Sequence, residues 1–228
     1  MMMKRRALLL TTLALVLVAG LLAPVCWRQW RLARQAEHSS KVYLSLYGDS
    51  LSFQQRVDEA RRYTASHGLN TQYVILVDFN KPSGDPARFR LYDLEARKTV
   101  LSSTCMHGAG AGSTDSRPAF SNRPGSNNSC LGKFHTAGRH TTGRVGQYRT
   151  PSINLVGKSG RANSNTSRRS ILIHGWAENA GRRGSHLRLN PRLSQGCFAI
   201  ESSKVRRLSE IITASDRPIL LWAYHNPT

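Results

Sequence analysis

The chain is poor in acidic residues. It contains 13 Asp and Glu against 33 Lys and Arg, and no acidic residue precedes Glu37, although six of the basic ones do. Without those six the part after residue 34 still carries a formal charge of +14. This imbalance argues against a cationic partner and favours an anionic one: nucleic acid, phospholipid headgroups or a carboxylate-rich wall polymer.

Aromatic residues are also scarce, at 7% of the chain. The basic residues are scattered, and no aromatic stacking motif is interleaved with them, as a nucleic-acid groove would require. We therefore expect no nucleic-acid partner and attribute the charge to the proximity of a wall or a membrane. No oligomeric state is predicted.

Local metal signatures are missing as well. The sequence has no HExxH, no paired CxxC and no H-x-H, so only a zinc site assembled from distant ligands remains open, and we expect no metal and no other cofactor. The glycine-rich run HGAGAGS at residues 107–113 does not fit GxGxxG, because Ser113 occupies the third glycine position and no helix pattern follows. A tightly turning loop is predicted there, with His107 lining a cleft as a candidate substrate-binding residue.

One long hydrophobic run is present near the start. Ala7–Val25 is 19 residues without a charge, about enough to cross the hydrocarbon layer as a helix and longer than a cleaved signal segment. We predict a signal anchor or transmembrane leader over residues 1–34, with Trp27 and Trp30 at the membrane interface. A signal peptide is the alternative. Cys26 does not follow the small residue that lipid attachment requires.

A polar linker is predicted over residues 35–50 and a single folded domain over 51–228, because 39% apolar residues suffice for one core. Helical spacing of apolar residues predicts helices at 52–68 and 202–215. Ser52 can cap the first of these helices and Gly68 can end it. Strands are predicted at 72–79, 88–94, 98–106, 170–175 and 218–224. The first three form a meander, and long loops around short strands are expected from 108 to 169.

Strands outnumber helices and do not alternate with them, and the sequence has no internal repeat. The predicted fold is mainly β: a β-sandwich or mixed sheet with one or two packed helices, preceded by the N-terminal membrane-anchor helix.

Three cysteines follow the leader. Cys105 and Cys130 can form a disulfide in an oxidising compartment. Cys197 is then left over, and an unpaired thiol in an exported protein indicates either reactivity or a small buried hydrophobe. Two neighbourhoods favour reactivity: Gly196 lets backbone amides approach an oxyanion, and His174, followed by Gly175, ends an apolar strand. A cysteine and a histidine so placed are the minimum for thiolate catalysis.

His174 lies in ILIHGW, which contains an H-G motif, and Cys197 lies in NPRLSQGCFAI, which contains an S-x-G-C motif. With these two motifs the sequence resembles the L,D-transpeptidases, the YkuD-type cysteine enzymes of bacterial cell walls. The resemblance extends to YVILVDFNKPSGDPARFRLYDL, HGAGAGS, FSNRPGS and LGKFHTAG, in that order, and so covers roughly residues 50–225.

The resemblance implies a β-rich fold around a cleft, with Cys197 as nucleophile and His174 as its proton partner. Ser194 and Gly175 would support the pair, and amides near Gly196 and Cys197 would form the oxyanion hole. Many members have His where Gln195 stands. Contacts to the substrate carboxylate would then come from Arg192 or other basic residues.

Three functions follow as hypotheses. The first is a periplasmic or otherwise extracytoplasmic transpeptidase, anchored in the inner membrane, that joins peptidoglycan stem peptides by 3-3 crosslinks through a cysteine thioester. The second is an L,D-carboxypeptidase or crosslink hydrolase that uses the same site with water as acceptor. The third is a catalytically silent basic module that binds an anionic wall polymer. The two enzymes require a sulfur that is held deprotonated beside an imidazole.

Overall fold

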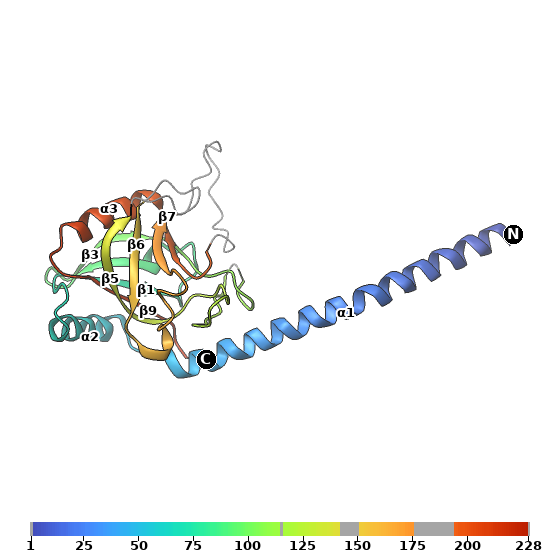
Figure 1. Cartoon of the computed structure of the whole chain (residues 1–228), viewed down its shortest axis with the longest axis horizontal. Coiled ribbons are helices and arrows are strands. Elements are labelled where there is room, and N and C mark those ends of the chain that lie inside the picture. Colours follow the sequence, from blue (N-terminus) through green and yellow to red (C-terminus); the bar gives the residue numbers. More distant parts are fainter. Residues whose placement is uncertain (1, 115, 142–150, 176–193, 228) are drawn as a thin grey trace.

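The computed structural model describes residues 2–114, 116–141, 151–175 and 194–227, without the side chains of 2–19 and 138–141. A long helix projects from a body built of strands and two shorter helices (Figure 1). The helices are α1 (Met2–Tyr47), α2 (Phe53–Ser66) and α3 (Ser202–Thr213). The strands are β1 (Tyr73–Asp78), β2 (Phe89–Asp93), β3 (Lys98–Ser103), β4 (Cys105–Met106), β5 (Gly132–Thr141), β6 (Ser152–Gly157), β7 (Leu172–Gly175), β8 (Phe198–Ile200) and β9 (Leu220–Tyr224).

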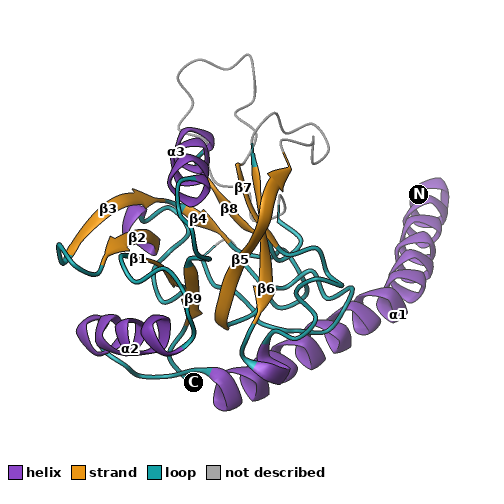
Figure 2. Cartoon of the chain, turned by 60° about the vertical axis from the view of Figure 1, so that its left-hand side comes forward, coloured by secondary structure: helices purple, strands orange, loops and turns teal. Residues whose placement is uncertain are grey.

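All nine strands belong to one mixed sheet in the order β3-β2-β1-β9-β5-β6-β7-β8-β4. Its two outermost strands, β3 and β4, are consecutive in the chain and separated only by Thr104. The sheet must therefore curl until its ends meet, and Figure 2 shows β3 and β4 approaching beneath α3. The mixed sheet and the packed helices agree with the sequence prediction, whereas a sandwich of two separate sheets is corrected to one nearly closed sheet.

The predicted meander is confirmed by the antiparallel pairings of β1 with β2 and of β2 with β3. The predicted strand 98–106 is instead divided at Thr104, because Cys105 and Met106 pair with Ile200 and Ala199 of β8 at the other end of the sheet. The last strand, β9, lies in the middle of the sheet, parallel to β1 and antiparallel to β5.

Both packed helices lie where the spacing predicted them. Ser52 caps α2 in a capping box with Gln55, and Gly68 follows the helix with a φ of +64°. The predicted inward residues of α3, Val205, Leu208 and Ile212, are buried.

The curled sheet separates two apolar cores. The inner core holds side chains from β1–β9 and α3. The second core lies where α2 packs on the other face of β1, β2 and β9, through residues such as Val57, Ala60 and Trp222. Because β1 and β9 bury both faces, they read as continuous apolar runs instead of alternating patterns.

Most of the segment predicted as a linker is helical, because α1 continues to Tyr47, and its last turns pack on the body. Tyr43 and Leu44 join the inner core. The Tyr43 hydroxyl donates to the Ala162 carbonyl at 2.6 Å and accepts from the Leu131 amide at 2.9 Å. Ser40 Oγ accepts from the Phe120 amide at 2.9 Å. These contacts make residues 40–47 part of the folded domain.

The membrane anchor predicted over Ala7–Val25 is not supported by the structure. No helix among the described residues holds a stretch sufficiently long and apolar to cross a bilayer. Most of the predicted span lies within residues 2–19, whose side chains are outside the described part.

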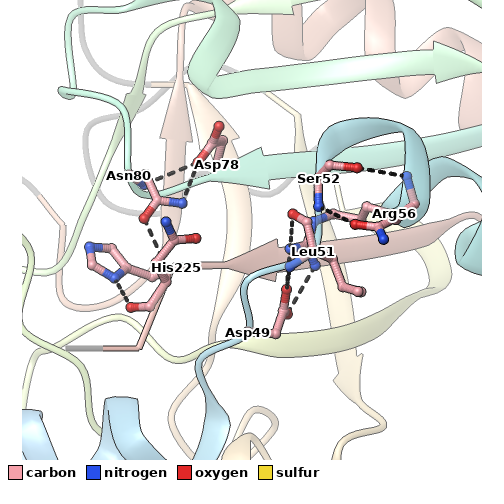
Figure 3. Close-up of polar contacts among 9 residues, drawn as sticks. Asp49, Leu51, Ser52, Arg56, Asp78, Asn80 and His225 are labelled. Atoms are coloured by element: carbon pink, nitrogen blue, oxygen red, sulfur yellow. Dashed lines mark hydrogen bonds and ion pairs between the residues drawn. The ribbon is translucent and has the colours of Figure 1, made fainter.

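An ion pair fixes the connection from α1 to α2 (Figure 3). The buried guanidinium of Arg56 donates to both carboxylate oxygens of Asp49 and lies 3.6 Å from the ring centroid of Tyr224 and 4.6 Å from that of Trp222. Since the aromatic faces and the carboxylate both attract the cation, α2 is held against β9 at this point.

Candidate active site

His174 and Cys197 come from two neighbouring parallel strands. In the register of β7 and β8, Ile173 is opposite Phe198 and His174 is opposite Ala199. Ile173 and Phe198 face the inner core, so His174 and Ala199 face the other side. Cys197 directly precedes β8, and alternation along an extended chain leads us to expect its thiol on the face of His174.

The Cys197 thiol is free and partly exposed. Its Sγ lies 3.5 Å from the Ser170 carbonyl, to which the thiol donates. Burial raises the pKa of Cys197, against the opposing effects of the Leu172 amide and the positive charge of Arg169. A raised pKa favours the protonated thiol in the protein without substrate.

The imidazole of His174 is only 5% exposed and has a defined tautomer. Its Nδ1 lies 2.9 Å from the Gly175 carbonyl, which can only accept, so Nδ1 carries the proton and Nε2 is the basic nitrogen. Burial lowers the pKa of His174, and the hydrogen bond to Gly175 opposes this effect. Both pKa shifts favour a neutral thiol and a neutral imidazole in the protein without substrate, so we expect the thiolate to form by proton transfer to His174.

Ser194 organises the turn that carries the cysteine. Its side chain is 1% exposed, accepts a hydrogen bond from the Gly196 amide at 3.1 Å and donates one to the Cys197 carbonyl at 2.7 Å. Through these two hydrogen bonds Ser194 holds the backbone on which Cys197 lies, which suits the supporting role that the resemblance implies. The Gly196 amide is engaged by Ser194 and does not point to an oxyanion, which leaves the Cys197 amide from the predicted pair.

Gly196 is required by both conformation and space. Its φ is +110°, and a Cβ there would stand 2.7 Å from a guanidinium nitrogen of Arg169 and 2.7 Å from the Asn128 carbonyl oxygen. Arg169 in turn donates to the Ser121 carbonyl at 2.7 Å and to the Asn128 carbonyl. The turn before Cys197 therefore packs directly against the partly buried guanidinium of Arg169.

The glycine-rich loop supports the same turn. The Ala109 amide donates to the Ser194 carbonyl at 3.0 Å. The Gly108 amide donates to Ser129 Oγ at 2.9 Å, and that hydroxyl donates to the Gly196 carbonyl at 3.5 Å. A Cβ on Gly108 or Gly110 would collide with the backbone of residues 126–129. The glycines are explained by this close packing of two loops, as the expected tight turn requires.

His107 is fully buried, and the structure gives its ring a structural role. Nδ1 accepts from both terminal nitrogens of the buried Arg88 guanidinium, each at 3.3 Å, and Nε2 lies 2.8 Å from the Thr114 carbonyl, to which it donates. The ring therefore holds the two ends of the glycine-rich loop, and the expectation that it lines a cleft and contacts substrate is corrected.

Cys105 and Cys130 are free and belong to the inner core. Burial raises the pKa of Cys105 to about 12 and that of Cys130 to about 11. The disulfide that the sequence allowed is not formed, and both thiols are unreactive small hydrophobes.

Arg192 lies outside the described residues. Within the described ranges no three His, Cys, Asp or Glu side chains are gathered as a metal site would require. Sequence reasoning missed Arg169, which has no motif of its own; its place five residues before His174 was the only available signal.

Several solved structures are similar to this chain. The helical cell shape determining protein Pgp2 (K307A mutant) from Campylobacter jejuni has a TM-score of 0.47 at 13% identity, over 75% of this chain and 55% of that one. The L,D-transpeptidase (residues 123–326) from Xylanimonas cellulosilytica DSM 15894 has 0.32 at 10%, over 72% and 68%. The Ldtfm-avibactam carbamoyl enzyme has 0.35 at 13%, over 68% and 49%.

The chain thus spans about half the length of the first of these structures. None of the curated proteins matches it. Residues 48–224, which include the sheet, α2, α3 and the turn of Cys197, match the family model of the L,D-transpeptidase catalytic domain. The chain therefore belongs to the L,D-transpeptidase catalytic domain family.

Proposed function

We propose that the protein is a cysteine-dependent L,D-transpeptidase that forms 3-3 crosslinks in peptidoglycan. The observation that supports this proposal is that His174 lies in β7 and that Cys197 directly precedes β8, the strand that pairs in parallel with β7. Family membership supports the chemistry, and the excess of basic residues suits a wall polymer that carries carboxylates.

The reaction begins with proton transfer. When a wall tetrapeptide binds, the Cys197 proton moves to Nε2 of His174, and Sγ attacks the carbonyl at the L-centre of the diaminopimelate residue. The tetrahedral oxyanion accepts a hydrogen bond from the Cys197 amide. The bond to D-alanine breaks, His174 returns its proton to the leaving amine, and a thioester remains. An amine of a second stem then attacks the thioester, releases the thiol and completes the crosslink.

The acceptor distinguishes this function from the hydrolytic alternative. Incubation of the purified full chain with disaccharide tetrapeptides, followed by muropeptide analysis, should give new 3-3 dimers. Trimmed tripeptides without dimers would instead assign an L,D-carboxypeptidase to the same two residues. In cells, an unchanged muropeptide profile with Cys197→Ala would leave only a binding module.

The site of action is part of the proposal. Peptidoglycan lies outside the cytoplasm, so the domain acts in the periplasm or another extracytoplasmic space, and we propose that the apolar run Ala7–Val25 attaches it to the inner membrane. Protease added outside spheroplasts should then degrade the domain, and complete protection would contradict this orientation.

A further inference from the structure

A groove of about 380 Å³ lies between the C-terminal half of α1 and the loop that follows the glycine-rich run. It is separate from the turn of Cys197, and the proposed reaction does not use it. Its lining combines apolar and charged side chains: Trp30, Ala33, Arg34, Glu37, Ser40, Lys41, Leu44, Gly112, Arg117, Pro118, Ala119 and His225.

The groove carries an excess of positive charge. Lys41 pairs with Glu37 at 3.3 Å. The pKa of Glu37 is lowered first by the hydrogen bond and charge of Lys41, and also by the charges of Arg34 and Arg117, so all three cations converge on this carboxylate. Since Lys41 compensates Glu37, Arg34 and Arg117 remain to attract an anion.

The other part of the lining is apolar. Trp30 is 50% exposed, and the guanidinium of Arg34 lies 5.2 Å from its ring centroid. Ala33, Leu44 and Pro118 add aliphatic surface. A ligand that matches both parts has an anionic group next to an apolar body.

The preceding turns of α1 indicate where such a ligand comes from. Leu21 is 74% exposed, Leu22 and Val25 are also exposed, and Trp27 stacks on Trp30 with ring centroids 5.1 Å apart. This part of the helix projects from the body in Figure 1. These exposed apolar side chains are followed along α1 by Trp27, Trp30 and Arg34. The same order of residue types is found at the boundary of a bilayer, where Trp and Arg side chains lie among the headgroups.

We propose that this groove binds the headgroup of an anionic phospholipid. Arg34 and Arg117 hold the phosphate, while Trp30 contacts the glycerol and the first acyl carbons. The bound lipid fixes the body at a defined height on the membrane surface. This proposal rests on the membrane attachment proposed above, but it is independent of the chemistry at Cys197.

The test uses the full chain in nanodiscs that contain phosphatidylglycerol and phosphatidylcholine. Native mass spectrometry of the released protein should show retained phosphatidylglycerol and no retained phosphatidylcholine. Arg34→Gln combined with Arg117→Gln should reduce the retained lipid at least fivefold. Lys98→Gln combined with Arg217→Gln removes the same charge from exposed positions outside the groove and should change nothing.

Equal retention of both lipids, or full retention by the Arg34/Arg117 variant, would overturn the proposal. So would loss of binding to purified peptidoglycan sacculi by this variant with unchanged lipid retention, because the groove would then bind the wall polymer. Failure of the wild-type chain to enter nanodiscs would overturn the membrane attachment as well. Cys197→Ala should retain the lipid, so a failure of the proposed enzyme function is seen separately.

Discussion

The Ser194 hydroxyl donates a 2.7 Å hydrogen bond to the carbonyl of Cys197. It also accepts from the Gly196 amide, so one buried side chain closes the turn from which the thiol projects. The position of the proposed nucleophile is thus set by a side chain that has no part in the proposed reaction.

Ser194→Ala should lower the transfer rate roughly tenfold or more, while Ser194→Thr retains most of it. Loss of a buried hydrogen-bonding partner costs about 1–3 kcal/mol, and about 1.4 kcal/mol in a barrier corresponds to a factor of ten. Steady-state rates of dimer formation measure the effect. Equal rates for the alanine variant and the wild type would show that the turn holds its shape without Ser194.

The free protein should show no preformed thiolate. Because the pKa of Cys197 is raised and that of His174 is lowered, both groups are neutral near neutral pH, and the thiolate population increases only as the pH rises toward the thiol pKa. In a Cys26→Ser background, which removes the exposed cysteine, iodoacetamide labelling of Cys197 should accelerate about tenfold per pH unit from neutral pH upwards. A rate that is constant down to acidic pH would indicate a thiolate–imidazolium pair instead.

Arg169→Gln should slow the same labelling several-fold, because the charge of Arg169 opposes the raised pKa of Cys197 and its side chain supports the backbone at Gly196. The neighbouring residue Arg168 is exposed, so Arg168→Gln is a matched control that removes the same charge one position away. If both substitutions slowed labelling equally, Arg169 would act only through the overall positive charge near Cys197 and not through its own contacts.

Tyr43→Phe should lower the free energy of unfolding by about 1–3 kcal/mol, since the Leu131 amide and the Ala162 carbonyl would lose a buried partner. Thermal denaturation of the full chain measures this change. The control is Tyr47→Phe, which keeps the ring contact with Tyr43 and should have little effect. Similar melting for both variants would mean that the last turns of α1 do not belong to the domain.

The sequence predicted those elements that are determined by interactions between residues close together in the chain. Ser52 and Gln55 form the capping box of α2, and the spacing of Val205, Leu208 and Ile212 marks the buried face of α3. The S-x-G-C motif corresponds to a turn that Ser194 closes through hydrogen bonds to Gly196 and Cys197, all within four residues. These predictions needed no knowledge of distant parts of the chain.

Features that depend on distant contacts were not predictable in this way. Nothing local shows that Thr104 divides a strand between opposite ends of the sheet, or that Tyr43 is buried against residues 131 and 162. In the sequence nothing distinguishes Arg169 from the other arginines, and only the folded structure shows that it packs against Gly196. The burial of His107 by Arg88 is likewise a product of tertiary packing, which explains why a histidine beside glycines was mistaken for a cleft residue.

The central claim is that Cys197 is an acylated nucleophile served by His174. The most direct measurement is the intact mass of the full chain after incubation with a disaccharide tetrapeptide in the absence of an acceptor. The wild type should gain the mass of the donor minus D-alanine, His174→Gln should gain it at least a hundredfold more slowly, and Cys197→Ala should gain none. An adduct of unchanged size on Cys197→Ala, or none on the wild type under conditions that yield dimers, would contradict the account.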